Sequence, residues 1–382
     1  MREKKSFLAN NAVQSILAAI LCIIFGLFIG FLVLLAINPG GAWNGIVTIT
    51  KNFLNYPSQA AAIKYLGNTL VKMAPLLMCA LSINFCYKTG LFNIGAAGQY
   101  VVGAGACLYA ALAWKLPWFV CILIALAAGL IWGFAVGVLK AYLNVNEVIS
   151  GIMLNWIGLY LVNMLLNGVK EKASPYTEQI SAINSKALLP TLGLDALFSK
   201  NKYVTIAVPL AILIAIVIWV VLNKTKFGYE IRATGFNKEA ARYAGMNEKR
   251  NIILTLAIGG GLAAVGAAFL YLSGYEQWSV TQSSVPSMGF NGIAATFLGG
   301  LNPIGTIFSS YFIQHITSGG AYLDKSMYPS QIADLITAII IYLCGFVLFF
   351  KLTLNKRIAT KNERNANAVD TANKSEGGGA DK

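Results

Sequence analysis

Long apolar stretches alternate with short polar ones along most of the chain. The first apolar run covers about residues 13–37 and follows a short basic start. A helix needs roughly 20 apolar residues to cross the hydrocarbon of a bilayer. By that criterion the further candidates lie at about 65–86, 91–113, 118–139, 147–167, 203–222, 251–272, 288–301, 303–318 and 331–350. The pattern predicts an all-α, polytopic membrane protein with about ten transmembrane helices in a membrane domain at 13–350.

The least regular part of the pattern is 288–318. It is rich in glycine and contains Pro303, so we expect two short or broken helices there. Elsewhere, Gly129, Gly133 and Gly137 form a row of small residues on one predicted helix, and Gly260, Ala264 and Ala268 form a second row on another. Small residues let helices approach closely inside a membrane, so these rows indicate tight helix packing.

Composition supports the membrane assignment. Hydrophobic residues make up 57% and charged residues 12%, whereas soluble domains carry roughly 25% charged residues. This excludes a soluble enzyme, a secreted disulfide scaffold and a disordered protein. The six cysteines lie in or beside apolar runs without a CxxC pair, so we expect buried side chains and neither a metal site nor a disulfide.

The placement of lysine and arginine predicts the orientation. Most of the 29 basic residues fall in segments that are cytoplasmic if both ends of the chain lie inside the cell. The prediction is a multi-pass protein of the cell (inner or plasma) membrane with a cytoplasmic N-terminus at 1–12, an outside loop at 168–202, a cytoplasmic loop at 223–250 and a cytoplasmic, disordered tail at 351–382. Because the basic excess is explained by topology, it indicates the lipid bilayer as the surroundings and no nucleic-acid partner.

Chemistry-bearing motifs are scarce. The chain has no GxxxxGK[ST] nucleotide loop and no HExxH, and its single histidine, His315, lies within a predicted span, where a packing role is expected. Lys72 is the one charge well inside a span, whereas ion-coupled transporters usually carry more. We therefore expect no enzyme activity, no cofactor, no metal and no energy source within the chain.

Uncharged amides mark a candidate solute pathway. One stretch holds Phe92, Asn93 and Gln99, and a similar Phe-Asn pair, Phe290 and Asn291, recurs in the second half of the chain. In the ten-span topology the two stretches enter the membrane from opposite sides, as an inverted repeat would require. On a neighbouring span, Asn155 and Trp156 add an amide and an aromatic ring, with Asn163 beyond them. Together they suit a polar, neutral, ring-containing solute; hydrogen bonding between helices is the alternative.

The predicted cytoplasmic loop contains a short helix. Asn237 is a plausible N-cap, Glu239 lies in the first turn, and Gly245 is a plausible stop. Ala240, Ala241 and Ala244 give this helix a small face that could dock on another protein, although a simple solvated connector fits the same residues.

The loop also carries a resemblance. The string from Gly228 to Gly245, G-x-x-x-R-A-x-G-x-N-x-x-A-A-x-x-x-G, which includes Gly235 and Asn237, resembles the coupling loop of ABC-importer permeases of the branched-chain amino acid, ribose and nucleoside family. The stretches at 93–99 and 146–155 are similar to the same family, the second to its nucleoside and simple-sugar branch. Met246 departs from the isoleucine common after the loop glycine.

The resemblance implies one permease subunit of an ABC importer, with no catalytic group of its own. It implies a second permease subunit (a paralogue or a copy of this chain), ABC ATPase subunits docked on the loop helix and an external substrate-binding protein. It favours a nucleoside, then a simple sugar, over a branched-chain amino acid. The alternative from another class is a self-sufficient secondary transporter, which would need ligands for a coupling ion within its spans.

Overall fold

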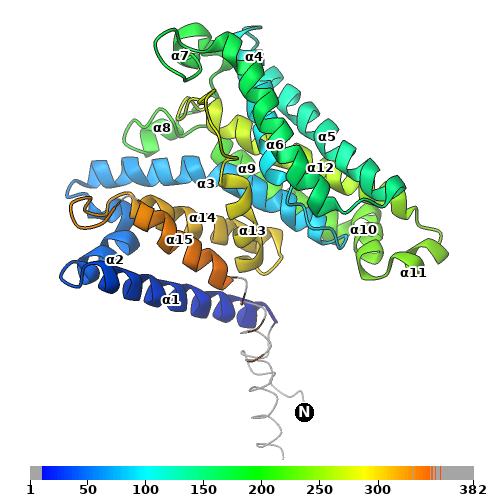
Figure 1. The fold of residues 1–382 in the computed structure, drawn as a ribbon, viewed down its shortest axis with the longest axis horizontal. Helices are drawn as coiled ribbons and strands as arrows, with labels where there is room; N and C mark the ends of the chain where they lie inside the picture. The colour runs from blue at the N-terminus through cyan, green and yellow to red at the C-terminus, as the bar shows by residue number, and fades with distance from the viewer. Residues whose placement is uncertain (1–10, 330, 345, 347–348, 350–352, 354–382) are drawn as a thin grey trace, which may run out of the picture.

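The computed structural model describes residues 11–329, 331–344, 346, 349 and 353 of the 382 (Figure 1). The predicted cytoplasmic N-terminus lies outside the described residues up to residue 10, and so does the predicted tail apart from residue 353.

The described residues form a helical bundle that matches the apolar runs. Its main helices are α1 (Asn11–Ile37), α3 (Gln59–Tyr87), α4 (Ala96–Leu112), α5 (Trp118–Leu143), α6 (Glu147–Leu166), α9 (Ala207–Lys224), α12 (Glu248–Tyr271), α13 (Met288–Leu298), α14 (Pro303–Gly320) and α15 (Gln331–Cys344). Of these, α1, α3, α5, α6, α9 and α12 are long and apolar enough to cross a membrane. Apart from two isolated β-bridges, no extended pairing occurs in the described part of the chain, which confirms the all-α prediction.

The irregular region at 288–318 consists of two short helices, as expected. α13 ends at Leu298, and a tight turn with Leu301 in the left-handed region leads to Asn302. The Asn302 side chain caps α14 by accepting a hydrogen bond from the Ile304 amide at 2.9 Å, and Pro303 takes the first helical position, where its missing N–H costs nothing.

Short elements lie at the ends of the bundle. α2 (Ala42–Lys51) and η2 (Asn52–Asn55) follow α1; η3 (Asn167–Val169), α7 (Ile180–Ile183), η4 (Ser185–Ala187) and α8 (Leu194–Leu197) form the predicted outside loop; α10 (Lys226–Phe236) and α11 (Lys238–Tyr243) form the predicted cytoplasmic loop. Figure 1 shows α8 near one end of α3 and α7 near the end of α4, whereas α10 and α11 lie on the opposite side of the bundle. The two predicted loops thus lie on opposite faces of the bundle.

The glycine rows bring α5 and α12 into close contact. A Cβ atom built on Gly133 would lie 2.2 Å from the carbonyl oxygen of Leu256, and one built on Gly129 would lie 2.4 Å from that of Gly260. Only residues without a side chain fit at this separation. The predicted packing role of the two rows is confirmed.

The neighbours of α3 and α12 follow a common pattern. α12 packs against α4 and α5, and α3 packs against α13 and α14, while α3 and α12 also contact each other. α4 contacts α5 and α6, as α13 contacts α14 and α15. This is the set of neighbours that two inverted copies of a four-helix unit, α3–α6 and α12–α15, would have.

Candidate solute pathway and coupling loop

A cavity of about 460 Å³ lies between α3, α4, α12, α13 and α14. We refer to it as the inner cavity. Its polar lining comes from Lys72, Glu276, Gln282, Asn291, Gln314 and Thr317, and its aromatic lining comes from Tyr100 and Tyr271. A cavity with convergent polar groups on an apolar scaffold is the usual form of a small-molecule site.

One wall of the inner cavity is an irregular segment, residues 272–287, which links α12 to α13. Trp278 of this segment is fully buried, and its indole Nε1 donates a hydrogen bond to Asn163 Oδ1 at 2.9 Å. Asn163 Nδ2 in turn donates to the Gln282 carbonyl at 2.9 Å. Asn163 of α6 therefore holds the segment in place by both ends of its amide.

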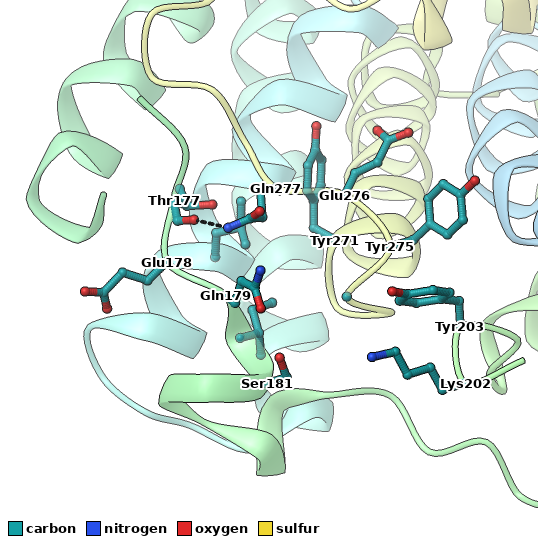
Figure 2. A pocket seen from close by; sticks show the side chains of 13 residues that line it. Thr177, Glu178, Gln179, Ser181, Lys202, Tyr203, Tyr271, Tyr275, Glu276 and Gln277 are labelled. Atoms are coloured by element: carbon teal, nitrogen blue, oxygen red, sulfur yellow. Dashed lines mark hydrogen bonds between the residues drawn. The ribbon is translucent and has the colours of Figure 1, made fainter. Parts of the chain in front are cut away.

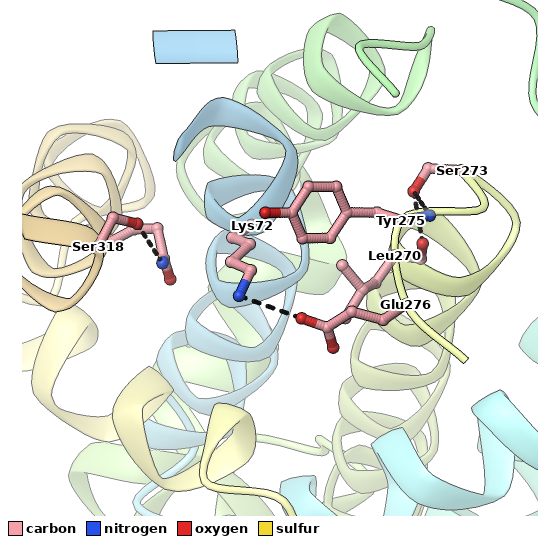
Figure 3. A network of polar contacts seen from close by, with 7 residues as sticks. Lys72, Leu270, Ser273, Tyr275, Glu276 and Ser318 are labelled. Atoms are coloured by element: carbon pink, nitrogen blue, oxygen red, sulfur yellow. Dashed lines mark hydrogen bonds and ion pairs between the residues drawn. The ribbon is translucent and has the colours of Figure 1, made fainter. Parts of the chain in front are cut away.

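An ion pair joins this segment to α3. Lys72 Nζ lies 3.1 Å from Glu276 Oε1 and 5.3 Å from the centre of the Tyr275 ring (Figure 3). Both charged side chains are about one-third exposed, so the pair borders a hollow and is not sealed in the packed core. Nearby on α14, Gln314 Nε2 donates to Ser318 Oγ at 3.0 Å.

The structure gathers several of the amides predicted for the pathway around the start of α4. Asn93 Nδ2 donates to Ser82 Oγ at 3.0 Å and to Gln99 Oε1 at 2.9 Å. Asn155 Nδ2 donates to the Ile94 carbonyl at 3.1 Å, and its Oδ1 accepts from the Gly98 amide at 2.7 Å. These side chains are buried, and Gln99 Nε2 has no hydrogen-bond partner.

The remaining predicted pathway residues lie apart from this cluster. Asn291 lines the inner cavity, with Phe290 beside it on α13, and Phe92 is half-buried just before α4. Trp156 lies on the exposed face of α6, where its ring stacks near that of Tyr160. Of the seven predicted residues, Asn291 alone lines this cavity; the roles of all seven in transport stay predictions.

Sequence reasoning did not find Glu276 or Gln282. Both belong to a segment between apolar runs, which a span-by-span interpretation treats as an external loop. Lys72 was noted as an isolated charge inside a span, and an unpaired lysine there would have been costly. That cost was the signal that a carboxylate partner should exist.

The histidine behaves as expected. His315 Nδ1 lies 3.2 Å from Asn52 Nδ2, and His315 Nε2 lies 2.8 Å from the Thr50 carbonyl oxygen. Both ring nitrogens are thus used in packing α14 against the α2–η2 region. Among the described residues no group of three or more His, Cys, Asp or Glu side chains could hold a metal ion.

The predicted helix of the cytoplasmic loop is α11. Asn237 Oδ1 accepts a hydrogen bond from the Ala240 amide at 2.9 Å, which confirms the N-cap. Gly245 has φ +81°, its amide donates to the Arg242 carbonyl at 2.9 Å, and the Met246 amide donates to the Ala241 carbonyl at 3.0 Å. These two bonds form the C-terminal motif in which glycine is favoured.

The loop is seated firmly on the bundle. A Cβ atom on Gly235 would lie 2.3 Å from the Lys88 carbonyl oxygen at the end of α3. Asn251 Nδ2 of α12 donates to Thr234 Oγ1 at 3.0 Å. Movement of the loop would therefore be passed directly to α3 and α12.

The outward face of the loop differs from the expected one. Ala241 is 4% exposed and packs against the chain itself, so it cannot present a flush surface to a partner. Glu239 and Ala240 are exposed, and so are two aromatic side chains that the sequence analysis did not single out, Phe236 at 94% and Tyr243 at 91%. Exposed aromatic rings on a polar loop are typical of contact sites for other proteins.

Comparison with known proteins identifies the family. Residues 65–345, which include the inner cavity and the loop with α10 and α11, match the family described as branched-chain amino acid transport system / permease component. The chain belongs to this family. As a member of this permease family it is a multi-pass membrane protein and not an enzyme, in agreement with the predictions from sequence.

Individual relatives cover most of the permease chain. The nucleoside ABC transporter permease protein NupB of Lactococcus lactis subsp. cremoris is 31% identical over 92% of this chain and 96% of its own length. The guanosine ABC transporter permease protein NupP of Bacillus subtilis is 31% identical over 85% of this chain and 92% of its own length. A glucose ABC transporter permease protein of Haloferax volcanii is 28% identical over 87% of each chain. No solved structure matches the permease chain.

Proposed function

We propose that this permease is the membrane subunit of an ABC importer for nucleosides. The observation that carries the proposal is its similarity, over nearly the full length of both chains, to permeases named for nucleosides and guanosine. Family membership also argues against the self-sufficient secondary transporter considered from the sequence.

The chemistry of the inner cavity supports a neutral, ring-containing solute. Tyr100 and Tyr271 lie in the cavity wall with 1% and 6% of their surface exposed, so a nucleobase would stack on these rings once the cavity widens around them. Asn291 and Gln314 offer uncharged donors and acceptors suited to ribose hydroxyls and base edges. The amides around the start of α4, Asn93, Gln99 and Asn155, would shape the pathway next to it.

The partners follow from the two faces of the bundle. The loop with α10 and α11 would dock an ABC ATPase subunit through its exposed residues, and the outside loop at 168–202 would receive the external binding protein. A second permease subunit would complete the importer. Solute would pass as ATP hydrolysis on the partners alternates access between the two sides.

The proposal is tested by Asn291→Leu. The importer is expressed with its ATPase and binding protein, and uptake of tritiated guanosine is measured in cells matched for permease level in the membrane. We expect uptake to fall at least tenfold, because the change removes an amide from the cavity wall and adds apolar bulk. Asn223→Leu is the matched control, since the Asn223 side chain is exposed at the end of α9 and bonds its own helix.

Normal guanosine uptake by Asn291→Leu would remove the inner cavity from the pathway. If the wild-type importer takes up no nucleoside while it imports another solute, such as a simple sugar, the substrate assignment is wrong although the family assignment stands.

A further inference from the structure

A second hollow lies outside the inner cavity. It has a volume of about 230 Å³ and lies between the outside loop and the ends of α4 and α12. Figure 2 shows Gln179, Ser181, Lys202, Tyr203 and Gln277 converging on it. We refer to this hollow as the outer pocket.

The outer pocket and the inner cavity adjoin. Tyr271 and Glu276 line both of them. In Figure 2 the Glu276 carboxylate points away from Gln179, Ser181 and Lys202, and in Figure 3 it meets the Lys72 ammonium group. The Lys72–Glu276 pair therefore lies at the division between the two hollows.

Glu276 is tied to the outside loop through the residues that follow it in the chain. Gln277 Nε2 donates to Glu171 Oε1 at 2.9 Å and to the Thr177 carbonyl at 2.6 Å, and the Thr177 amide donates to the Trp278 carbonyl at 2.9 Å. Hydrogen bonds from Ser174 and Gln277 hold the pKa of Glu171 below its ordinary value, so this carboxylate is ionised at neutral pH. Any shift of the outside loop would carry Glu276 with it.

The lining of the outer pocket suits the same class of solute as the inner cavity. The rings of Tyr203 and Tyr275 meet edge to face, with centres 5.3 Å apart, and Lys202 Nζ lies 5.2 Å from the centre of the Tyr203 ring. Gln179 and Ser181 add donors and acceptors without charge. Aromatic surface next to hydrogen-bonding groups fits a nucleobase joined to a ribose.

We propose that the outer pocket is a solute subsite of this permease and that the Lys72–Glu276 pair is the gate between it and the inner cavity. The identity of the solute as a nucleoside rests on the proposed function. A nucleoside released by the binding protein would first occupy the outer pocket. It would pass when the outside loop withdraws Glu276 from Lys72.

The ion pair has the properties that a gate requires. Its partners come from separate elements, α3 and the 272–287 segment, so parting them needs no helix to unfold. Both side chains border water-accessible hollows, and exposed pairs of this kind are weak. While the pair is open, hydroxyl and N–H groups of the solute can donate hydrogen bonds to Glu276, and carbonyl groups of the solute can accept hydrogen bonds from Lys72. Neither charge is then left without a hydrogen-bond partner.

The subsite is tested by direct binding. Tritiated guanosine is titrated onto the purified permease–ATPase complex in nanodiscs without the binding protein. Ser181→Trp places an indole in the outer pocket and should weaken binding at least tenfold. Ser185→Trp is the matched control, because Ser185 is exposed on the same loop and does not line the pocket.

Each result is decisive for the subsite. Equal binding by Ser181→Trp and the control, or no binding by a wild-type complex that supports uptake in cells, overturns it while the proposed function stands. If binding is lost in Asn291→Leu but not in Ser181→Trp, guanosine occupies the inner cavity alone. If wild-type cells take up no nucleoside, the proposed function itself has failed.

The gate is tested by exchanging the charges. Lys72→Glu and Glu276→Lys, each alone, place like charges together and should raise the ATP hydrolysed per guanosine imported severalfold, because the gate no longer closes. The double variant restores an ion pair and should return this ratio toward that of the wild type. Single variants with a normal ratio, or a double variant no better than the singles at equal membrane level, rule out the gate.

Discussion

At the scale of single residues, the absence of a side chain decides how α5 and α12 meet. The two helices cross through Gly129, Gly133 and Gly137 on one side and Gly260 on the other, with backbone carbonyls where a Cβ would stand. Apolar side chains add little to association in lipid, so this close contact of backbones is a main source of attraction between the helices.

Gly133→Val should therefore disrupt the bundle. Its added carbons would collide with the Leu256 carbonyl, which belongs to the helix backbone and cannot turn aside. Overpacking in a core costs about 1–3 kcal/mol or more, and we expect a lower membrane yield and a lower melting temperature in detergent. The control is Gly168→Ala, where a Cβ would meet nothing within 4 Å. Equal melting temperatures for Gly133→Val and the wild type would contradict the packing argument.

At the scale of elements, α11 is a preformed helix with a specific outward face. Its six residues are too few to be stable alone, but Asn237 caps one end and Gly245 closes the other. Ala241 is buried, so the backbone that carries the exposed rings of Phe236 and Tyr243 is fixed relative to the bundle. A partner can then bind without ordering the loop first, which lowers the entropy cost of docking.

Tyr243→Ala and Phe236→Ala should each weaken the ATPase contact. An aromatic anchor of an interface can contribute about 2 kcal/mol, so we expect roughly a thirtyfold loss of ATPase affinity and a matching loss of substrate-stimulated hydrolysis. Phe308→Ala is the control, since Phe308 is 72% exposed on α14, outside the loop. Binding by pull-down and hydrolysis by phosphate release give the readouts, and unchanged values for both loop variants would show that the contact is made elsewhere.

The elements were largely predictable from the sequence, whereas the lining of the hollows was not. Apolar runs reveal a span because each must fill the bilayer, and a cap is local chemistry, so α13, α14 and Asn237 were foreseen. Trp156 shows the limit of prediction from local sequence. It follows Asn155 in the chain, but successive residues on a helix point about 100° apart. Asn155 therefore faces α4, whereas Trp156 faces outward. The positions of Glu276, Phe236 and Tyr243 depend on how the loops fold back onto the bundle, and no local sequence pattern predicts that.

At the scale of the whole molecule, the two predicted loops lie on opposite faces of the bundle, and in the proposed importer this arrangement would set the direction of transport. The outside loop bonds to the 272–287 segment next to the cavity, and the loop with α11 contacts the inner ends of α3 and α12. In the proposed importer, one loop would act on the 272–287 segment that follows α12 and the other on α3 and α12 themselves, from opposite faces of the bundle.

Single cysteines at Lys186 and Lys238 test this orientation. Both positions are exposed, and the described native cysteines are buried and form no disulfide, so they should react little with the reagent even before they are replaced. In intact cells a membrane-impermeant maleimide should label position 186 and leave position 238 unlabelled until the cells are broken. Labelling of position 238 alone in intact cells would show that the topology is the reverse of the predicted one.

The central place of α3 also bears on how the protein is made. α3 is synthesised early, yet its neighbours α9, α12, α13 and α14 all come later. Its polar groups wait for those partners: Asn84 Nδ2 donates to Thr306 Oγ1 at 3.3 Å, and Lys72 pairs with Glu276. Until they arrive, a nascent chain would hold an amide and an ammonium group against lipid, so α3 must stay beside the insertion machinery or other early helices. We therefore expect the bundle to be complete only when the last third of the chain has entered the membrane, since a chain cut short after α9 would lack the partners of Asn84 and Lys72.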